Sequence, residues 1–146
     1  MLTINIICVG KIKENYLRDM INDYAKRISK YHKIEIIELT DSNINKEKEE
    51  LLRVINTKDY NIVMDIDGNN LSSREFAEKI DKTFLINSNI TFIIGGSDGI
   101  SPEIKELANY RLSFSKLTFP HQLFRGILLE QIYRAFKILN NESYHK

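Results

Sequence analysis

Several residue types are scarce in this chain, and their scarcity limits what the protein can be. Its 146 residues include one cysteine, two prolines and no tryptophan. The single cysteine, Cys8, lies in an apolar stretch, which excludes an intrachain disulfide and favours a reduced, cytoplasmic protein. No apolar run approaches the length that crosses a bilayer, and the first predicted strand begins at residue 2. We therefore expect neither a membrane span nor a signal peptide.

Closely spaced metal ligands are also missing. The three histidines, His32, His121 and His145, are far apart in the sequence and are accompanied by the lone cysteine. Zinc sites are built from several such ligands at short, regular spacings. We therefore expect a protein without a metal site.

No segment has the composition of a linker, a repeat or a low-complexity tract. Hydrophobic residues make up 42% of the chain and charged residues 28%, which is typical of a globular protein. The length suits one compact domain with a core of ordinary size. The sequence therefore predicts a single domain over residues 1–146.

The net charge of +1 hides an uneven distribution of charge. Residues 1–33 and 111–146 are rich in lysine and arginine, whereas residues 34–110 are rich in aspartate and glutamate. If both basic ends fold onto one face, they form a surface suited to a polyanion. Scattered, solvated surface charge explains the same pattern equally well.

Hydrophobic periodicity predicts strands that alternate with helices, which is typical of an α/β domain on a mainly parallel sheet. The turn at residues 67–70 is expected to end the third strand. A capping box begins at Ser72, and Ser101 followed by Pro102 is a typical helix start. The predicted strands cover residues 2–9, 34–39, 61–66, 90–94 and 110–114, and the other predicted helices cover residues 15–30, 41–57 and 121–139.

A glycine-rich turn, Gly95-Gly96-Ser97-Asp98-Gly99, follows the fourth predicted strand. It is neither a Walker loop nor the Rossmann fingerprint, and Asp98 would repel a phosphate. Glycines nevertheless let main chain approach a ligand at the carboxyl end of a sheet. The turn therefore suits a nucleoside without phosphates, such as the cationic S-adenosylmethionine, although a purely structural turn explains it as well.

The last predicted helix, residues 121–139, has an unusually wide apolar arc of roughly 200° at 100° per residue. One face of a sheet needs only about half that width. The arc therefore indicates a second covered surface, which we interpret as a homodimer contact. Arg125 lies near the middle of the arc, so it must meet a carboxylate, a backbone carbonyl or a ligand.

Over nearly its whole length the sequence resembles a known family. The resemblance rests on "VGKIKENY" near the start, on "GGSDG", on the long block "LSFSKLTFPHQLFRGILLEQIYRAFKI" and on the terminal "YHK". These motifs resemble those of the SPOUT-class methyltransferases that act on pseudouridine in large-subunit ribosomal RNA. Residues 40–60 match no motif of that family.

The resemblance implies a fold, a cofactor and an assembly. It implies an α/β domain of the SPOUT type whose C-terminal part forms a deep trefoil knot, bound S-adenosylmethionine, and a homodimer. Matched position by position, it implies cofactor contacts from the ends of three predicted strands and from the loop after the last of them. These residues are Met64, Gly95, Phe114, Ser115, Lys116, Leu117, Thr118 and Phe119.

The implied reaction transfers a methyl group to N3 of a pseudouridine, whose imide proton must leave. A general base, or a cation beside the imide anion, would help. The candidates are His121, Arg125 and Arg134, together with Tyr144 and His145 of a short tail that could reach a partner's pocket. For His121, a helix cap or a core hydrogen bond is an equally good explanation.

A domain this small has no room for a separate RNA-binding module. We therefore expect it to recognise ribosomal RNA by shape, within the assembled ribosome, with a dimer providing the contact area. Two alternatives stay open. One is a knotted methyltransferase acting on a ribose 2′-hydroxyl, and the other is a non-catalytic protein associated with RNA or the ribosome.

Overall fold

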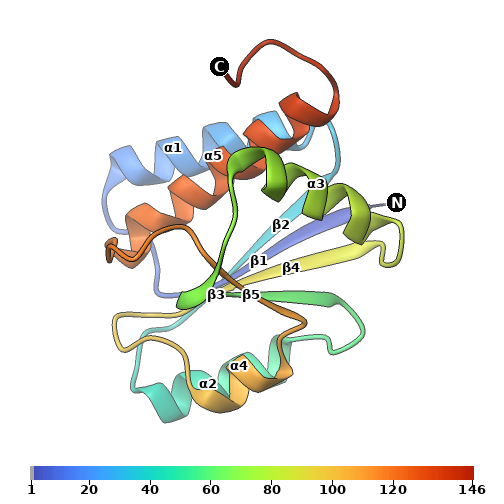
Figure 1. The fold of residues 1–146 in the computed structure, drawn as a ribbon. Coiled ribbons are helices and arrows are strands. Elements are labelled where there is room, and N and C mark those ends of the chain that lie inside the picture. Colours follow the sequence, from blue (N-terminus) through green and yellow to red (C-terminus); the bar gives the residue numbers. More distant parts are fainter. Residues whose placement is uncertain (1) are drawn as a thin grey trace.

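The computed structural model describes residues 2–146 as three layers, with a sheet between two layers of helices (Figure 1). The predicted strands and helices are all present, with ends that differ by a few residues. The strands are β1 (Thr3–Val9), β2 (Lys33–Leu39), β3 (Tyr60–Asn70), β4 (Asn89–Ile94) and β5 (Tyr110–Ser113). The helices are α1 (Asn15–Ile28), α2 (Ile44–Val54), α3 (Ser73–Phe84), α4 (Pro102–Leu107) and α5 (His121–Leu139).

The five strands form one sheet in the order β2-β1-β4-β3-β5, and every neighbouring pair is parallel. The α/β class and the mainly parallel sheet are therefore confirmed. Parallel strands need crossover connections, and these place α1 and α3 on one face and α2 and α4 on the other (Figure 1). The last helix, α5, follows β5 and packs on the same face as α1 and α3. All carboxyl ends of the strands consequently meet at one edge of the sheet.

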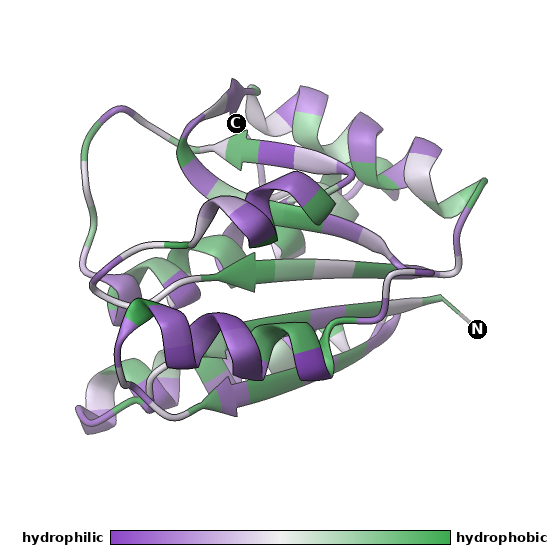
Figure 2. Cartoon of the chain, turned by 90° about the horizontal axis from the view of Figure 1, so that it is seen from below, coloured by the Kyte–Doolittle hydropathy of each residue, from purple (hydrophilic) through white to green (hydrophobic). Residues whose placement is uncertain are grey.

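Each face of the sheet has its own hydrophobic core. The larger core lies under α1, α3 and α5 and includes Ile6, Phe92 and Phe136. The smaller one lies under α2 and α4 and includes Val63 and Ile93. Viewed from the side of α2 and α4, the central strands are apolar while the outer surfaces of these helices are polar (Figure 2). Burial on both faces explains why the strands read as nearly continuous apolar runs.

Side-chain caps fix where the helices begin. Ser72 and Glu75 form the expected capping box at α3, and the Ser101 hydroxyl accepts from the Ile104 amide at α4. Asn43 caps α2, so this helix begins at Ile44 rather than at residue 41 as the sequence predicted. The predicted start was wrong because several neighbouring polar residues can each cap a helix, and in the structure Asn43 does so.

The turn predicted at residues 67–70 was also wrong, because β3 continues to Asn70. Both Met64 and Asn69 pair with Leu112 of β5, so the four residues between them form an irregularity within the strand. Side-chain amides then hold the extension: Asn70 Nδ2 donates to the Ser113 carbonyl at 3.0 Å. At the irregularity, a Cβ on Gly68 would lie 2.7 Å from the Arg111 carbonyl carbon and oxygen. The backbone of β3 therefore passes the backbone of β5 here with no space for a side chain between them.

The wide apolar arc of α5 has an explanation within the chain. The helix lies on the sheet and is flanked by α1 and α3 (Figure 1). Leu128, Leu129 and Ile132 are fully buried in the larger core, and Gly126 faces Met20 of α1. The second surface that the arc requires is supplied by these two helices, so the arc does not by itself argue for a dimer.

None of the helices in residues 2–146 is both long enough and apolar enough to cross a membrane.

The crossing at Gly68 makes a prediction about stability. Gly68→Ala should lower the free energy of unfolding by about 1–3 kcal/mol, because rigid backbone cannot move away from the new methyl group. Gly126→Ala is the matched control: its new methyl would meet the flexible end of Met20 at 2.9 Å, and alanine favours the helix. Urea unfolding of both variants measures the difference. Equal stability of the two variants would contradict the close crossing.

Candidate functional site

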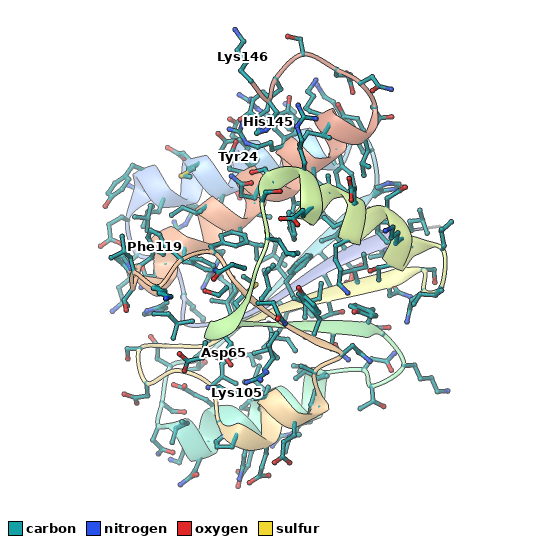
Figure 3. All side chains as sticks on the ribbon, in the orientation of Figure 1. Tyr24, Asp65, Lys105, Phe119, His145 and Lys146 are labelled. Atoms are coloured by element: carbon teal, nitrogen blue, oxygen red, sulfur yellow. The ribbon has the colours of Figure 1, made fainter. Side chains whose placement is uncertain are left out.

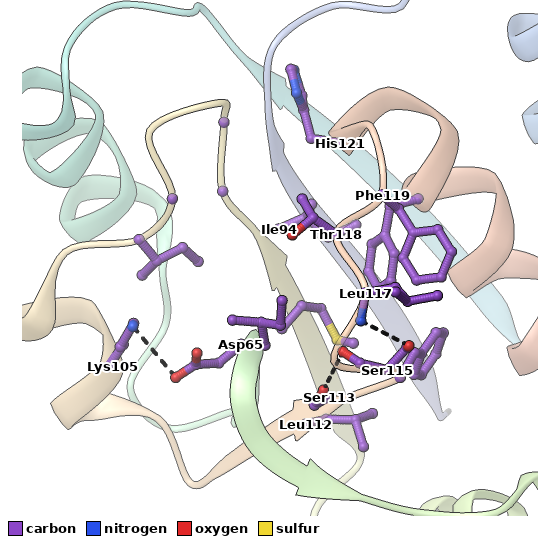
Figure 4. Close-up of a pocket in the computed structure, with 18 residues that line it drawn as sticks. Asp65, Ile94, Lys105, Leu112, Ser113, Ser115, Leu117, Thr118, Phe119 and His121 are labelled. Atoms are coloured by element: carbon purple, nitrogen blue, oxygen red, sulfur yellow. Dashed lines mark hydrogen bonds and ion pairs between the residues drawn. The ribbon is translucent and has the colours of Figure 1, made fainter.

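A pocket of about 260 Å³ lies where β4 and β5 end, beside Met64, Asp65 and Ile66 in the middle of β3 (Figure 4). Its volume is near the lower end of the range for small-molecule sites. It is lined by strand ends, by the glycine turn after β4, by the loop after β5 and by the first turn of α5. The lining residues are Met64, Asp65, Ile66, Ile94, Gly95, Gly96, Gly99, Ile100, Lys105, Leu112, Ser113, Phe114, Ser115, Leu117, Thr118, Phe119, His121 and Phe124.

The glycine turn is folded tightly against itself. The Gly99 amide donates to the Gly96 carbonyl at 3.0 Å, and Gly99 has a φ of +80°, which glycine adopts without strain. A Cβ on Gly95 would lie 2.6 Å from Ile100 Cγ1 and 2.7 Å from the Gly99 carbonyl oxygen. A side chain at position 95 would therefore open the turn. The turn thus presents bare main chain to the pocket.

The loop after β5 is fixed by serines. The Ser113 hydroxyl donates to the Ser115 carbonyl at 3.0 Å, and the Leu117 amide donates to Ser115 Oγ, also at 3.0 Å (Figure 4). Phenylalanines support this loop from behind: the ring of Phe114 lies 5.2 Å from that of Phe124. The loop therefore forms an apolar wall with exposed main-chain groups, which suits a flat ring such as a nucleobase.

Charges within the pocket are already paired. The Asp65 carboxylate is buried and lies 3.5 Å from Lys105 Nζ and 3.3 Å from Arg111 Nη1 (Figure 4). Its second oxygen accepts from the Asp67 amide at 3.1 Å. Asp65 and Lys105 were not predicted from the sequence, although Asp65 directly follows Met64 in β3. With its lysine neutralised in this way, the pocket offers little to a phosphate.

His121 is the one candidate catalytic residue that lines the pocket. It is the first residue of α5 and lies at the end of the pocket opposite Leu112 (Figure 4). Its Nε2 atom is buried and has no hydrogen-bond partner among the described residues. The ring therefore makes no core hydrogen bond at this atom to the described residues.

Arg125 does not line the pocket. Its side chain is 1% exposed, forms an ion pair with Glu38 and donates to the Gly10 carbonyl at 2.8 Å. The sequence predicted that this arginine must meet a carboxylate or a backbone carbonyl, and it meets both. Arg125 thus fastens α5 to the ends of β1 and β2.

The remaining candidates form a separate cluster around Glu130, in the middle of α5, and Figure 3 shows His145 away from Phe119, which lines the pocket. Glu130 pairs with Arg134 at 2.7 Å and accepts from the Tyr144 hydroxyl at 2.7 Å, and Arg134 donates to Nδ1 of His145 at 3.1 Å. Burial and the hydrogen bond to Glu130 raise the pKa of Tyr144 above its usual range. In this chain, the tail therefore packs on its own last helix.

The structure thus divides the residues predicted from the sequence into groups. Of the predicted cofactor contacts, all but Lys116 line the pocket. Lys116 is exposed on the loop that forms the wall. Of the predicted catalytic residues, His121 belongs to the pocket, Arg125 lies buried behind it, and Arg134, Tyr144 and His145 lie together elsewhere.

Comparisons with known proteins agree with this architecture. A family model described as a predicted SPOUT methyltransferase matches residues 2–145. The chain is 52% identical to the ribosomal RNA large subunit methyltransferase H of Clostridium botulinum (strain Loch Maree / Type A3), with 99% of this chain and all of that protein covered. It is 49% identical, with the same coverage, to ribosomal RNA large subunit methyltransferase H 1 of Clostridium perfringens (strain SM101 / Type A).

A solved structure shows the same fold at low identity. A protein from Legionella pneumophila, in complex with bound SAM, superimposes with a TM-score of 0.51 at 11% identity, covering 92% of this chain and 66% of that one. The sequence comparisons and the fold agree. The chain therefore belongs to the SPOUT methyltransferases, in the family of the ribosomal RNA large subunit methyltransferases H.

Proposed function

We propose that this protein transfers a methyl group from S-adenosylmethionine to N3 of a pseudouridine in large-subunit ribosomal RNA, in the assembled ribosome and in the cytoplasm. The observation that carries the proposal is the pocket of main chain and apolar side chains beside the middle of β3 and the ends of β4 and β5. The names of the half-identical relatives support ribosomal RNA as the substrate. The bound SAM in the Legionella protein, which shares this fold, supports S-adenosylmethionine as the methyl donor.

The pocket fits this donor chemically. S-adenosylmethionine has an adenine ring, no phosphate and a cationic sulfonium. The apolar wall around Phe114 and Leu117 suits the ring, and the main chain of residues 115–119 and of Gly95 can pair with its polar edge. Met64 supplies a further apolar surface. The donor, when bound, supplies the electrophilic methyl carbon, and the protein has to hold it in line with the acceptor nitrogen.

The reaction balances without a covalent enzyme intermediate. The N3 lone pair of the uracil forms a bond to the methyl carbon, the carbon–sulfur bond breaks, and its electron pair stays on sulfur. The N3 proton has to be accepted by a base. A thiol intermediate has no candidate, because burial raises the pKa of the Cys8 thiol to about 12.

His121 is the proposed base, because it lines the pocket and its buried Nε2 has no partner among residues 2–146. Arg125 is proposed as a positioning residue: its bonds to Glu38 and to the Gly10 carbonyl hold the first turns of α5, and hence His121, against the sheet. Arg134, Tyr144 and His145 would act at the pocket of a second subunit, as part of a homodimer.

A trefoil knot in the C-terminal part is also proposed. The close crossing of Gly68 over Arg111 supports it, because the chain between β3 and β5 must form a loop around the later segment for a knot to exist. Stretching single molecules from their termini tests it: a knotted chain stops extending short of the full length of an unfolded chain. Extension to full length would contradict the knot.

His121→Ala should lower kcat by about 100-fold or more, because a general base contributes at least that factor. The dissociation constant of S-adenosylhomocysteine should change little. The measurement is transfer of labelled methyl from S-adenosylmethionine into ribosomes from cells that lack this protein, followed by nucleoside analysis. Gln122→Ala, in the same turn of α5, is the control and should keep full activity. Methyl found on a ribose, or no transfer by the wild type, would reject the proposed reaction.

The dimer proposal predicts complementation between two inactive variants. One variant carries His121→Ala with an intact tail, and the other lacks residues 144–146 but keeps His121. In a mixed dimer, one pocket receives His121 from one chain and the tail from the other. Co-expression should restore about a quarter of wild-type activity, since half of the dimers are mixed and each has one complete site. If the tail acts on its own chain, no pocket is complete and no activity returns.

A further inference from the structure

Two carboxylates lie beside the pocket, close to the end that His121 occupies. Asp41 follows β2, and Glu47 lies in the first turn of α2, so both belong to the segment for which the sequence showed no family motif. They approach the backbone of two glycines, Gly10 and Gly96, which end β1 and follow β4. Gly96 and His121 themselves line the pocket.

Distances to the positions that side chains would occupy on the glycines define this arrangement. A Cβ on Gly96 would lie 3.3 Å from Glu47 Oε1 and 3.5 Å from Asp41 Oδ1. A Cβ on Gly10 would lie 2.9 Å from Asp41 Oδ1 and 3.2 Å from His121 Nε2. The carboxylates can approach this closely because both positions carry no side chain. Asp41 therefore lies near Glu47 at Gly96 and near His121 at Gly10.

One carboxylate oxygen of Glu47 accepts a hydrogen bond, and the other accepts none from the described residues. The residue is 5% exposed, and its Oε2 accepts from the Ser42 amide at 2.8 Å. Its Oε1 is buried and has no hydrogen-bond partner among the described residues. Asn43 fixes the same turn by capping α2. Glu47 Oε1 is therefore a positioned acceptor, directed at the backbone of the glycine turn.

The nearby cationic side chains form ion pairs with other acidic residues. Arg125 pairs with Glu38, and Lys48 pairs with Glu103 at 3.0 Å. No ion pair within residues 2–146 includes Asp41 or Glu47. A buried carboxylate oxygen without a partner is costly, and the cost is removed when a cation binds to it. Asp41 and Glu47, which lie beside the pocket without lining it, therefore carry negative charge that no ion pair within residues 2–146 balances.

We propose that Asp41 and Glu47 bind the ammonium group at the amino-acid end of the methyl donor. This inference rests on the proposed function, since it concerns the same pocket. An ammonium has three N–H donors and pairs well with carboxylate oxygens at hydrogen-bond distances. A metal ion fits less well, because no three histidine, cysteine, aspartate or glutamate side chains converge in the described part of the chain. The donor's own carboxylate then points away from Asp41 and Glu47.

The consequence is a division of the binding site. The loop after β5 holds the adenine end, while the start of α2 holds the amino-acid end. Two ligands separate these parts: S-adenosylhomocysteine has the amino-acid end, and 5′-methylthioadenosine has the adenosine and sulfur without it. Neither has a sulfonium, so their difference reports the amino-acid end.

The test measures binding of both ligands to the full chain by calorimetry. Glu47→Gln keeps the size of the side chain and removes its charge, and it should weaken S-adenosylhomocysteine about tenfold. Its affinity for 5′-methylthioadenosine should stay within about twofold of the wild type. Asp41→Asn should act in the same direction. Glu103→Gln makes the same change at a neighbouring, ion-paired and exposed carboxylate, and should alter neither affinity.

Each outcome decides between the explanations. If Glu47→Gln and Asp41→Asn leave S-adenosylhomocysteine unchanged, or weaken both ligands equally, the ammonium site is wrong while the proposed function stands. If the wild type binds neither ligand, the proposed function itself fails. Thermal unfolding shows whether Glu47→Gln remains folded; if it does not, Asp41→Asn decides, because Asp41 is exposed and has no structural hydrogen bond among those formed by the described side chains.

Discussion

The pairing of β3 with β5 is the interaction on which the pocket depends. This pairing brings Met64 of β3 next to Leu112 of β5, and β5 leads directly into the loop that forms the pocket wall. The extension of β3 then returns to β5 at Asn69, over the contact between Gly68 and Arg111. Because this contact leaves no space for a side chain, the loop after β5 is held in one place. Without this contact, the loop would have to become ordered when a ligand binds, and this ordering would cost free energy.

The sequence predicted the fold well where local chemistry decides it. Strands buried on both faces read as apolar runs, and the capping box at Ser72 and the Ser101-Pro102 start mark helices by themselves. It failed at residues 67–70, because glycine and asparagine are typical of turns and also of strand irregularities. Only the position of β5, more than forty residues away in the chain, decides between these structures. Likewise, the wide arc of α5 could not distinguish two flanking helices of the same chain from a second subunit.

The site was predictable to the extent that strand ends and the family motifs define it. Gly95 and Phe114 directly follow β4 and β5, Met64 lies within β3 just before its irregularity, and the parallel sheet places all three at one pocket. Asp41 and Glu47 could not be found in this way. They belong to a segment without a motif, and their relation to the pocket arises only because β1, β4 and α2 converge on Gly10 and Gly96. Arg134 and His145 resemble candidates for catalysis in the sequence, yet they lie in a different cluster because α5 is long.

The placement of charge connects these observations. Lys105 in the pocket and Arg125 behind it are neutralised by Asp65 and Glu38. The acids Asp41 and Glu47 are left without such partners. This arrangement disfavours phosphate and favours a ligand with positive charge, because the buried, unpaired carboxylate oxygen of Glu47 requires the opposite sign in a partner. In the proposed function, an anionic RNA would be bound outside the pocket, and only the reacting base would enter it. One small domain would then hold a cationic donor and a polyanionic acceptor on separate surfaces.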